Sequence, residues 1–168
     1  MTPAIGGSEP VRDSALLNRV GNYYCNPPNC SSMYNTKIVN GKAKRFRIAN
    51  TSAMALFHLT IQGHSMYVIE TDGILLEPGP AIQVLRINPA QRYSVIVKAD
   101  QNPGNYWIRA VMDPNIYPTG AKPGWQPEIF GIMYYTDNLG NKISLKDPLA
   151  SDYFYQIIFW LNQWQMQW

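Results

Sequence analysis

The chain has 168 residues, 46% of them hydrophobic and 15% charged, a balance that allows one domain to bury a hydrophobic core. The formal charge of +3 is mild, and the densest basic stretch, residues 42–47, is interrupted by Ala43 and Phe46, so nucleic-acid binding is not expected. No apolar window reaches the roughly 18 residues that a membrane span requires, and the N-terminus does not have the pattern of a signal peptide.

The N-terminal part of the chain combines a polar start with features of secreted proteins. Residues 1–14 are polar and without periodicity, and are interpreted as a linker. Cys25 and Cys30 flank a turn-rich Asn-Pro-Pro-Asn spacer that allows their Cβ atoms to approach, so a local disulfide is predicted. Asn29 and Asn50 each begin a match to the N-glycosylation pattern. These features suit an extracellular protein, whereas the start of the chain does not have the pattern of a signal peptide. We therefore expect the chain to be an internal piece of a longer secreted protein.

Three runs between Lys42 and Met112 alternate hydrophobic and polar residues with a period of two, the pattern of strands with one buried face. Their hydrophobic members are Phe46 and Ile48; Phe57, Leu59 and Ile61; and Tyr93, Val95, Val97 and Ala99. Turn-forming residues separate the runs, among them Gly63-His64-Ser65 and Asp72-Gly73. Short strands at this spacing predict an all-β sandwich or barrel.

The C-terminal third has a different character. Residues 113–127 are rich in proline and glycine and predict a long surface loop, and the run Gly131 to Tyr135 predicts one more strand. In the tail, residues 138–168, three tryptophans recur every four residues from Trp160 to Trp168, which is a helical spacing diluted by glutamines. Two interpretations stay open for this tail: a packing or interfacial helix, or a non-native end outside the domain.

Four motifs, in the same order, closely resemble the second cupredoxin domain of laccases and related multicopper oxidases. They are KRFRIANTSA at 44–53, IQGHSMYVIETDG at 61–73, PAQRYSVIV at 89–97 and PGNYWIRA at 103–110. Residues 13–18 are similar to the opening strand of that domain, although Arg19 stands where the family usually has a glycine. The resemblance implies a cupredoxin-like Greek-key β-sandwich at residues 15–137, after a linker from a missing first domain and before an unmatched tail.

The resemblance also implies copper chemistry in the intact enzyme, whose first and third domains would bind copper, oxidise phenols, amines or metal ions and reduce dioxygen to water. A blue-copper site needs two imidazoles and a thiolate. This sequence has His58, His64 and the two cysteines predicted to be bonded to each other, and it contains no His-x-His pair. We therefore predict no catalytic residue and no metal ligand here. His64 matches a family position that is not a ligand, and is expected to be a structural turn residue, like Asp72 and Gly73.

A middle domain of this type acts as a spacer between flanking cupredoxin domains 1 and 3, and its loops form one wall of the cleft for a phenolic or amine reductant. The resemblance places Ser52, Met54 and Phe57 in that wall. Laccases often present a carboxylate in this loop; here there is none, and Met54 offers an apolar contact instead. The alternative hypothesis is a non-catalytic module that binds a protein or carbohydrate partner through Tyr117 and Trp125.

Overall fold

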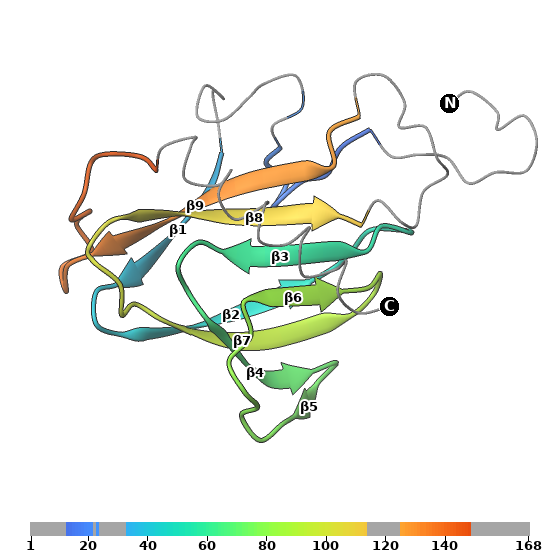
Figure 1. The fold of residues 1–168 in the computed structure, drawn as a ribbon, viewed down its shortest axis with the longest axis horizontal. Coiled ribbons are helices and arrows are strands. Elements are labelled where there is room, and N and C mark those ends of the chain that lie inside the picture. Colours follow the sequence, from blue (N-terminus) through green and yellow to red (C-terminus); the bar gives the residue numbers. More distant parts are fainter. Residues whose placement is uncertain (1–12, 22, 24–32, 114–124, 149–168) are drawn as a thin grey trace, which may run out of the picture.

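A computed structural model of the chain describes residues 13–21, 23, 33–113 and 125–148. These residues form strands and turns without any helix, so the predicted all-β fold is confirmed (Figure 1). In this part of the chain no helix is long and apolar enough to cross a membrane. The predicted disulfide between Cys25 and Cys30, the acceptor Asn29, Tyr117 and the tryptophan stripe at 160–168 lie outside the described residues.

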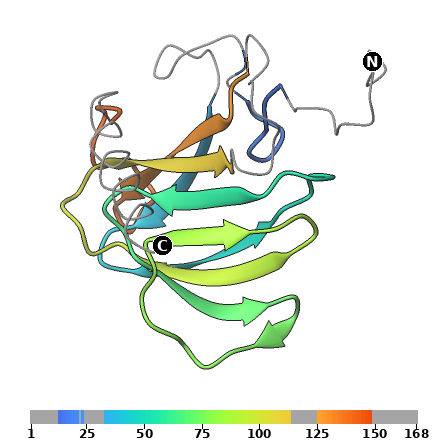
Figure 2. The same cartoon turned by 45° about the vertical axis from the view of Figure 1, so that its right-hand side comes forward.

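Within the described residues, nine strands form two stacked sheets (Figures 1 and 2). The strands are β1 (Tyr34–Val39), β2 (Ala43–Ala49), β3 (Phe57–Ile61), β4 (Met66–Thr71), β5 (Ile74–Leu75), β6 (Val84–Ile87), β7 (Arg92–Lys98), β8 (Asn105–Met112) and β9 (Glu128–Thr136). One sheet has the order β1-β9-β8-β3-β6 and the other the order β2-β7-β4-β5. The architecture is a β-sandwich whose core fills the space between the sheets.

The alternating runs become strands β2, β3 and β7, as predicted. In β2 the exposed side chains of Arg45 and Arg47 alternate with the half-buried Phe46 and Ile48. Ser94 of β7 differs from the expected solvent-facing position, because only 3% of it is exposed. It donates a hydrogen bond to Glu70 Oε2 and accepts one from Arg45, so neighbouring polar side chains cover it on the outer face of its sheet.

The main core draws on both sheets, and a second apolar cluster lies on the opposite face of the five-stranded sheet. Buried members of the main core include Ile38, Leu59, Ile61, Met66, Leu85, Val95, Val97, Ile108, Ile129, Met133 and Tyr135. Trp107 of β8 packs with Phe130, Ile132 and Tyr134 of β9 in the second cluster. Strand β9 is therefore buried on both faces, which explains why its sequence shows no clear alternation.

Strand β1 was not predicted, and it pairs in parallel with β9. Tyr34 lies opposite Gly131 in this pairing. A Cβ atom on Gly131 would come within 2.8 Å of Tyr34 Cδ1 and 2.9 Å of its carbonyl oxygen. The absence of a side chain at Gly131 therefore allows the close approach of the two strands.

The segment expected to be the opening strand forms a tight turn with one isolated bridge between Leu17 and Val20. Both backbone hydrogen bonds of that pair are present, at 2.8 and 2.9 Å. The two central residues, Asn18 and Arg19, have φ values of 46° and 69°. Positive φ at both positions is characteristic of a type I′ turn, in which a glycine in place of Arg19 would be free of strain.

The described start of the tail, residues 138–148, is attached to the ends of β8 and β9. The Ile143 amide donates to the Tyr135 carbonyl oxygen at 3.0 Å. Asn105 Nδ2 donates to the carbonyl oxygens of Ser144 and Lys146. The chain therefore follows the edge of the sandwich beyond residue 137, the boundary expected from the resemblance.

Candidate functional site

At one end of the sandwich, His64 occupies the turn that follows β3. Gly63 has a φ of 68°, and the His64 amide donates to the Ile61 carbonyl oxygen at 3.0 Å, which closes the turn. The imidazole is completely buried. Its Nδ1 lies 2.6 Å from the Gln62 carbonyl oxygen, an atom that can only accept, so the ring carries its proton on Nδ1.

This tautomer makes His64 Nε2 an acceptor, and the Tyr135 hydroxyl group donates to it at 2.6 Å. The same hydroxyl oxygen accepts a hydrogen bond from the Gln101 amide at 3.2 Å. Tyr106 packs its ring edge to face with the imidazole, with centroids 4.6 Å apart. Both ring nitrogens therefore have a hydrogen-bonding partner inside the protein. The ring is fixed between the turn after β3, Tyr106 of β8 and Tyr135 of β9.

The electrostatics of this network keep both rings neutral. Burial lowers the pKa of His64, against opposing contributions from the Gln62 carbonyl group and from Asp100. Burial also raises the pKa of Tyr135 to about 12, so its hydroxyl group retains the proton that it donates. In this arrangement neither ring nitrogen of His64 is left without a hydrogen-bonding partner.

Both described histidines already have polar partners within the domain. Both His64 nitrogens are engaged, and His58 Nε2 lies 3.2 Å from Asp113 Oδ2 in a partly buried pair. This carboxylate partner of His58 was not apparent from the sequence. Within residues 13–21, 23, 33–113 and 125–148, no three His, Cys, Asp or Glu side chains lie close enough to hold a metal ion.

Asp72 and Gly73 form the two-residue turn between β4 and β5. Their φ values are 47° and 89°, which suits an Asp-Gly hairpin turn. Asp72 Oδ1 accepts a hydrogen bond from the Arg92 amide at 2.9 Å. The nearby Glu70 carboxylate bonds to Ser94 and Arg45, and these contacts lower its pKa, with the Ser94 hydrogen bond contributing most. These carboxylates therefore serve turn and sheet structure.

At the other end of the sandwich, the loop after β2 is fixed by Asn50. Its Nδ2 donates to the carbonyl oxygens of Ala55 and Ile87 at 2.7 and 3.0 Å, while its Oδ1 accepts from the Ser52 amide. Only 7% of Asn50 is exposed. Both amide protons are used and buried, so the folded chain cannot carry a glycan on Asn50 despite the match to the acceptor pattern. Its anchoring role depends on long-range contacts that no local motif reveals.

The three residues proposed for a substrate-cleft wall lie on or next to this loop. Ser52 donates to the Ala55 carbonyl oxygen at 2.7 Å, and Phe57 packs against the main core at the start of β3. The side chains of both border a cavity between the sheets. Met54 is half-buried and does not border that cavity. The fold thus brings Ser52 and Phe57 together and places Met54 apart from them.

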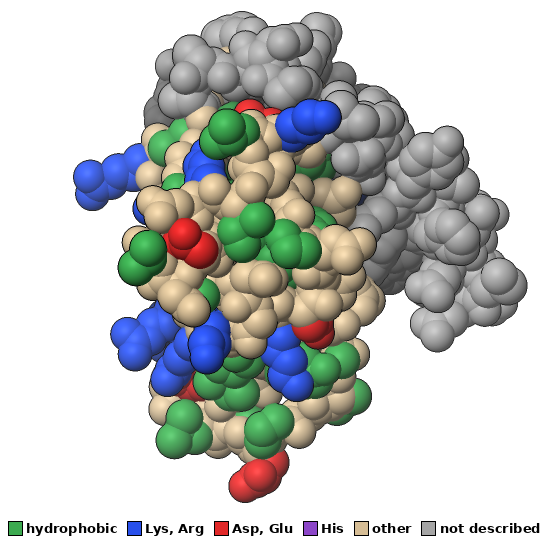
Figure 3. All heavy atoms as spheres, turned by 90° about the vertical axis from the view of Figure 1, so that its left-hand side faces the viewer, with side chains coloured by type: hydrophobic (Ala, Val, Ile, Leu, Met, Phe, Trp, Pro, Cys, Tyr) green, Lys and Arg blue, Asp and Glu red, His purple; other side chains and the backbone are tan. Residues whose placement is uncertain are grey.

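The basic residues of β2 are largely committed to contacts within the sheet. Lys44 Nζ donates to Thr36 Oγ1 and lies over the Phe46 ring, and Arg45 pairs with Glu70. On the face shown in Figure 3, lysine and arginine side chains occur in several separate groups, with neutral, hydrophobic and acidic side chains between them. This distribution differs from the continuous basic surface that binds nucleic-acid phosphates.

Comparisons with solved structures identify the fold. The crystal structure of Fet3p, described as a multicopper oxidase that functions in iron import, matches with a TM-score of 0.65 and 21% identity over 88% of this chain and 25% of its own. A laccase from Botrytis aclada matches with a TM-score of 0.67 and 24% identity, covering 84% of this chain and 26% of its own. At such low identities these structures establish the cupredoxin-like sandwich alone.

Sequence comparisons identify the family. The multicopper oxidase family model matches residues 2–125. Laccase-4 of Thanatephorus cucumeris is 41% identical over 127 residues, which cover 75% of this chain and 23% of that laccase. Laccase-1 of Pleurotus ostreatus is 36% identical over 115 residues, or 68% of this chain and 21% of its own length. The chain spans about a quarter of these relatives, and it belongs to the multicopper oxidase family as a laccase-like member.

Proposed function

We propose that this chain is the central, copper-free cupredoxin domain of a longer, secreted laccase-like multicopper oxidase. In this proposal residues 15–137 form the domain and residues 1–14 link it to a preceding one. The intact enzyme holds copper in flanking cupredoxin domains 1 and 3, oxidises a phenolic or amine reductant and reduces dioxygen to water. The domain itself sets the spacing of its two neighbours and contributes one wall of the substrate cleft.

The single observation that carries this proposal is the state of His64. A copper ligand must offer an unprotonated ring nitrogen to the metal. In His64, Nδ1 carries a proton and donates it to a carbonyl oxygen, and the lone pair of the unprotonated Nε2 already accepts from Tyr135, at 2.6 Å in both cases. His64, which matches a family position that is not a ligand, is thus engaged within the domain, and this supports a spacer role.

The coding sequence on either side of this chain tests the domain assignment. The proposal expects His-x-His pairs upstream and a His-Cys-His run downstream, because these supply the imidazoles and the thiolate that copper requires. A complete reading frame that contains neither would contradict the proposal, and would favour the alternative of a non-catalytic binding module.

The cleft wall is tested in the full-length enzyme by exchanging Met54. If its side chain contacts the reductant, Met54→Ala raises the Michaelis constant for a phenol while leaving the turnover number unchanged, because a ground-state contact is lost. Ala43→Ser, at the exposed start of β2, is the control. A Michaelis constant that is equal in the wild type, the Met54 variant and the control removes Met54 from the cleft.

A further inference from the structure

The hydrogen bond between Tyr135 and His64 joins a phenol to a base inside the protein. The Tyr135 hydroxyl group lies 2.6 Å from His64 Nε2, and this nitrogen is unprotonated because Nδ1 carries the ring proton and donates it to the Gln62 carbonyl oxygen. Proton transfer between positioned groups requires a distance of about 2.6 to 3.2 Å, and this pair lies at the short end of that range. The phenol proton therefore has an acceptor already in place.

Both partners are shielded from solvent. The exposed fraction of Tyr135 and of His64 is 0%. A proton that leaves Tyr135 therefore cannot pass directly to water, and His64 holds it next to the phenol oxygen. The same burial keeps solvent away from the tyrosine ring.

The surroundings of the pair can accommodate a second proton on the imidazole. The Gln62 carbonyl oxygen and the negative charge of Asp100 both raise the pKa of His64, against the larger effect of burial. The Gln101 amide donates to the Tyr135 oxygen at 3.2 Å, and it can continue to do so when the hydroxyl proton leaves. No hydrogen bond of this network has to break for the proton to move from Tyr135 to His64.

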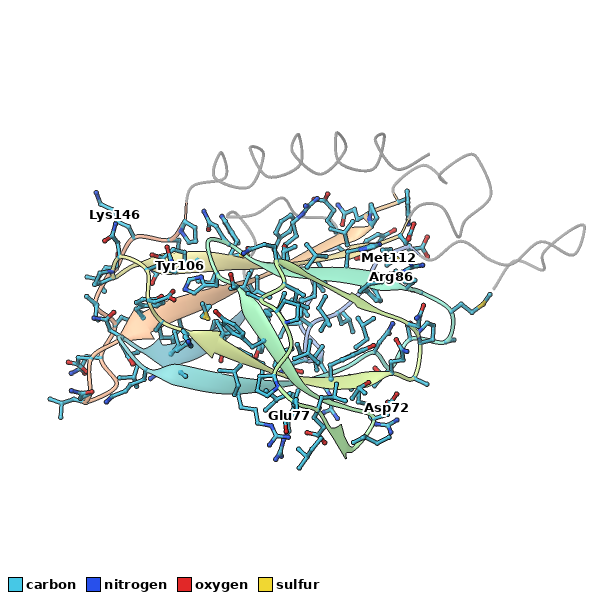
Figure 4. All side chains as sticks on the ribbon, turned by 60° about the horizontal axis from the view of Figure 1, so that its bottom comes forward. Asp72, Glu77, Arg86, Tyr106, Met112 and Lys146 are labelled. Atoms are coloured by element: carbon cyan, nitrogen blue, oxygen red, sulfur yellow. The ribbon has the colours of Figure 1, made fainter. Side chains whose placement is uncertain are left out.

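Tyr106 connects the buried pair to the surface. Figure 4 labels this residue near the start of β8, and its ring is half-buried. The centroid of the Tyr106 ring lies 5.2 Å from that of Tyr135 and 4.6 Å from that of His64. An electron can therefore leave Tyr135 through rings in contact, without an oxidant entering the protein.

We propose that Tyr135 and His64 form a redox-active pair that gives up one electron to an outer-sphere one-electron oxidant, such as an organic radical or a metal complex. In this step the oxidant takes one electron from the Tyr135 ring, the Tyr135 O–H bond breaks and an N–H bond forms at His64 Nε2. The products are a neutral tyrosyl radical, an imidazolium ion and the reduced oxidant. One electron from a reductant returns the proton to the tyrosine oxygen and restores the pair.

The proton acceptor decides which tyrosine holds the radical. A phenol that has lost an electron is a much stronger acid than imidazolium, so transfer to His64 is favourable even though burial lowers the pKa of His64. The Tyr106 hydroxyl group bonds to the Asn102 carbonyl oxygen, a far weaker base, and its oxidation is less favourable. The inference goes beyond the proposed function, because it concerns residues of this domain alone and requires neither copper nor flanking domains.

Flash oxidation tests the inference on the complete 168-residue chain. A photogenerated ruthenium(III) tris-bipyridine complex is the oxidant, and electron paramagnetic resonance detects the radical that persists. We expect a long-lived neutral tyrosyl radical in the wild type and at least about tenfold less of it in Tyr135→Phe, because the phenol beside the positioned base is removed. Tyr106→Phe is the matched control and should retain the radical, since its ring keeps the same packing. No long-lived tyrosyl radical in the wild type, or equal amounts in the two variants, overturns the inference.

Histidine enriched in the heavy isotope of nitrogen tests where the proton goes. The chain has two histidines, His58 and His64. Hyperfine spectroscopy of the wild-type radical should show coupling to a labelled nitrogen, because His64 Nε2–H then donates to the radical oxygen. The coupling should be lost in His64→Gln and retained in the matched control His58→Gln, whose imidazole is paired with Asp113 in the wild type.

Circular dichroism of each variant verifies that the fold is retained, and the wild-type hyperfine measurement needs no variant. A tyrosyl radical without coupling to a labelled nitrogen in the wild type contradicts the assigned proton transfer. Coupling that survives in a folded His64→Gln variant contradicts it equally.

Discussion

The Tyr135 hydroxyl group of β9 donates a hydrogen bond to His64 Nε2 at 2.6 Å and thereby joins that strand to the turn after β3. The same oxygen accepts from the Gln101 amide in the loop before β8. Three segments distant in sequence therefore meet at one hydroxyl group. Because His64 and Tyr135 are both completely buried, water cannot replace the hydrogen bond between them.

Replacing Tyr135 with phenylalanine should destabilise the domain by about 1 to 3 kcal/mol, because His64 Nε2 and the Gln101 amide both lose a buried partner. Urea denaturation measures the change. Tyr106→Phe is the matched control: its hydroxyl group bonds to the Asn102 carbonyl oxygen at an exposed position, so its removal should cost less. Equal destabilisation by the two variants would show that the buried hydrogen bonds of Tyr135 stabilise the domain no more than the exposed hydrogen bond of Tyr106 does.

The stability of the domain should fall as the pH drops below about 6.5. Burial lowers the pKa of His64 in the folded chain below its ordinary 6.5, so the unfolded state binds more protons in this range. The contribution of His64 to the free energy of unfolding is complete above the pKa that His64 has in the unfolded chain. It is lost as the pH falls toward the pKa of His64 in the folded chain, by at most about 1.4 kcal/mol per pH unit.

This pH dependence is measured by comparing urea denaturation of the wild type and His64→Gln from pH 8 down to about pH 5. The other titrating groups, including nearby Asp100, are common to both proteins, so the difference isolates His64. We expect the variant to lose less stability than the wild type below about pH 6.5. If the stabilities of the two proteins change with pH in parallel, the pKa of His64 is the same in the folded and the unfolded chain.

Arg19→Gly should stabilise the domain by about 0.5 to 1 kcal/mol. Arg19 has a φ of 69°, which is costly for a residue with a Cβ atom and free of strain for glycine, although glycine loses more entropy on folding. Asn18→Gly is the control, since asparagine tolerates the left-handed region and should gain little. Thermal unfolding measures both; destabilisation by Arg19→Gly would contradict the assigned turn.

Gly131→Ala should destabilise the domain by about 1 to 3 kcal/mol, because its Cβ atom would lie 2.9 Å from the Tyr34 carbonyl oxygen, which cannot move without the strand. Gly79→Ala is the control: a Cβ atom there meets nothing within 4 Å and the φ is not positive. That change should be neutral or slightly stabilising. If both substitutions are neutral in chemical denaturation, β1 and β9 are not in close contact at this point.

The strands with one buried face were predictable from the sequence. A strand buried on both faces was predictable only in part, and a strand that depends on long-range pairing was not predictable. Strands β2, β3 and β7 follow a period of two, so Phe46 and Leu59 were assigned to the buried face. Strand β9 is buried on both faces and shows no such period, and it was predicted only from Gly131 to Tyr135. Strand β1 depends on parallel pairing with β9, a long-range contact that local patterns do not encode.

The same distinction applies to the candidate sites. The turn positions of His64 and of Asp72-Gly73 were visible as local motifs, but the partners Tyr135 and Asp113 were not, because they come from β9 and from beyond the end of β8. Asn50 matched a glycosylation pattern, and three-dimensional contacts gave it an anchoring role instead. Residue types indicate which chemistry is available, and the pairing of distant strands decides which groups are already occupied.

The most direct test of the central claim is the copper content of the chain. The full 168-residue chain is incubated with copper, dialysed extensively, and analysed for metal and for blue visible absorption. The account predicts no stoichiometric copper and no blue colour, because His64 offers no free nitrogen. One tightly held copper ion per chain with blue absorption would contradict the assignment of this domain as a copper-free spacer.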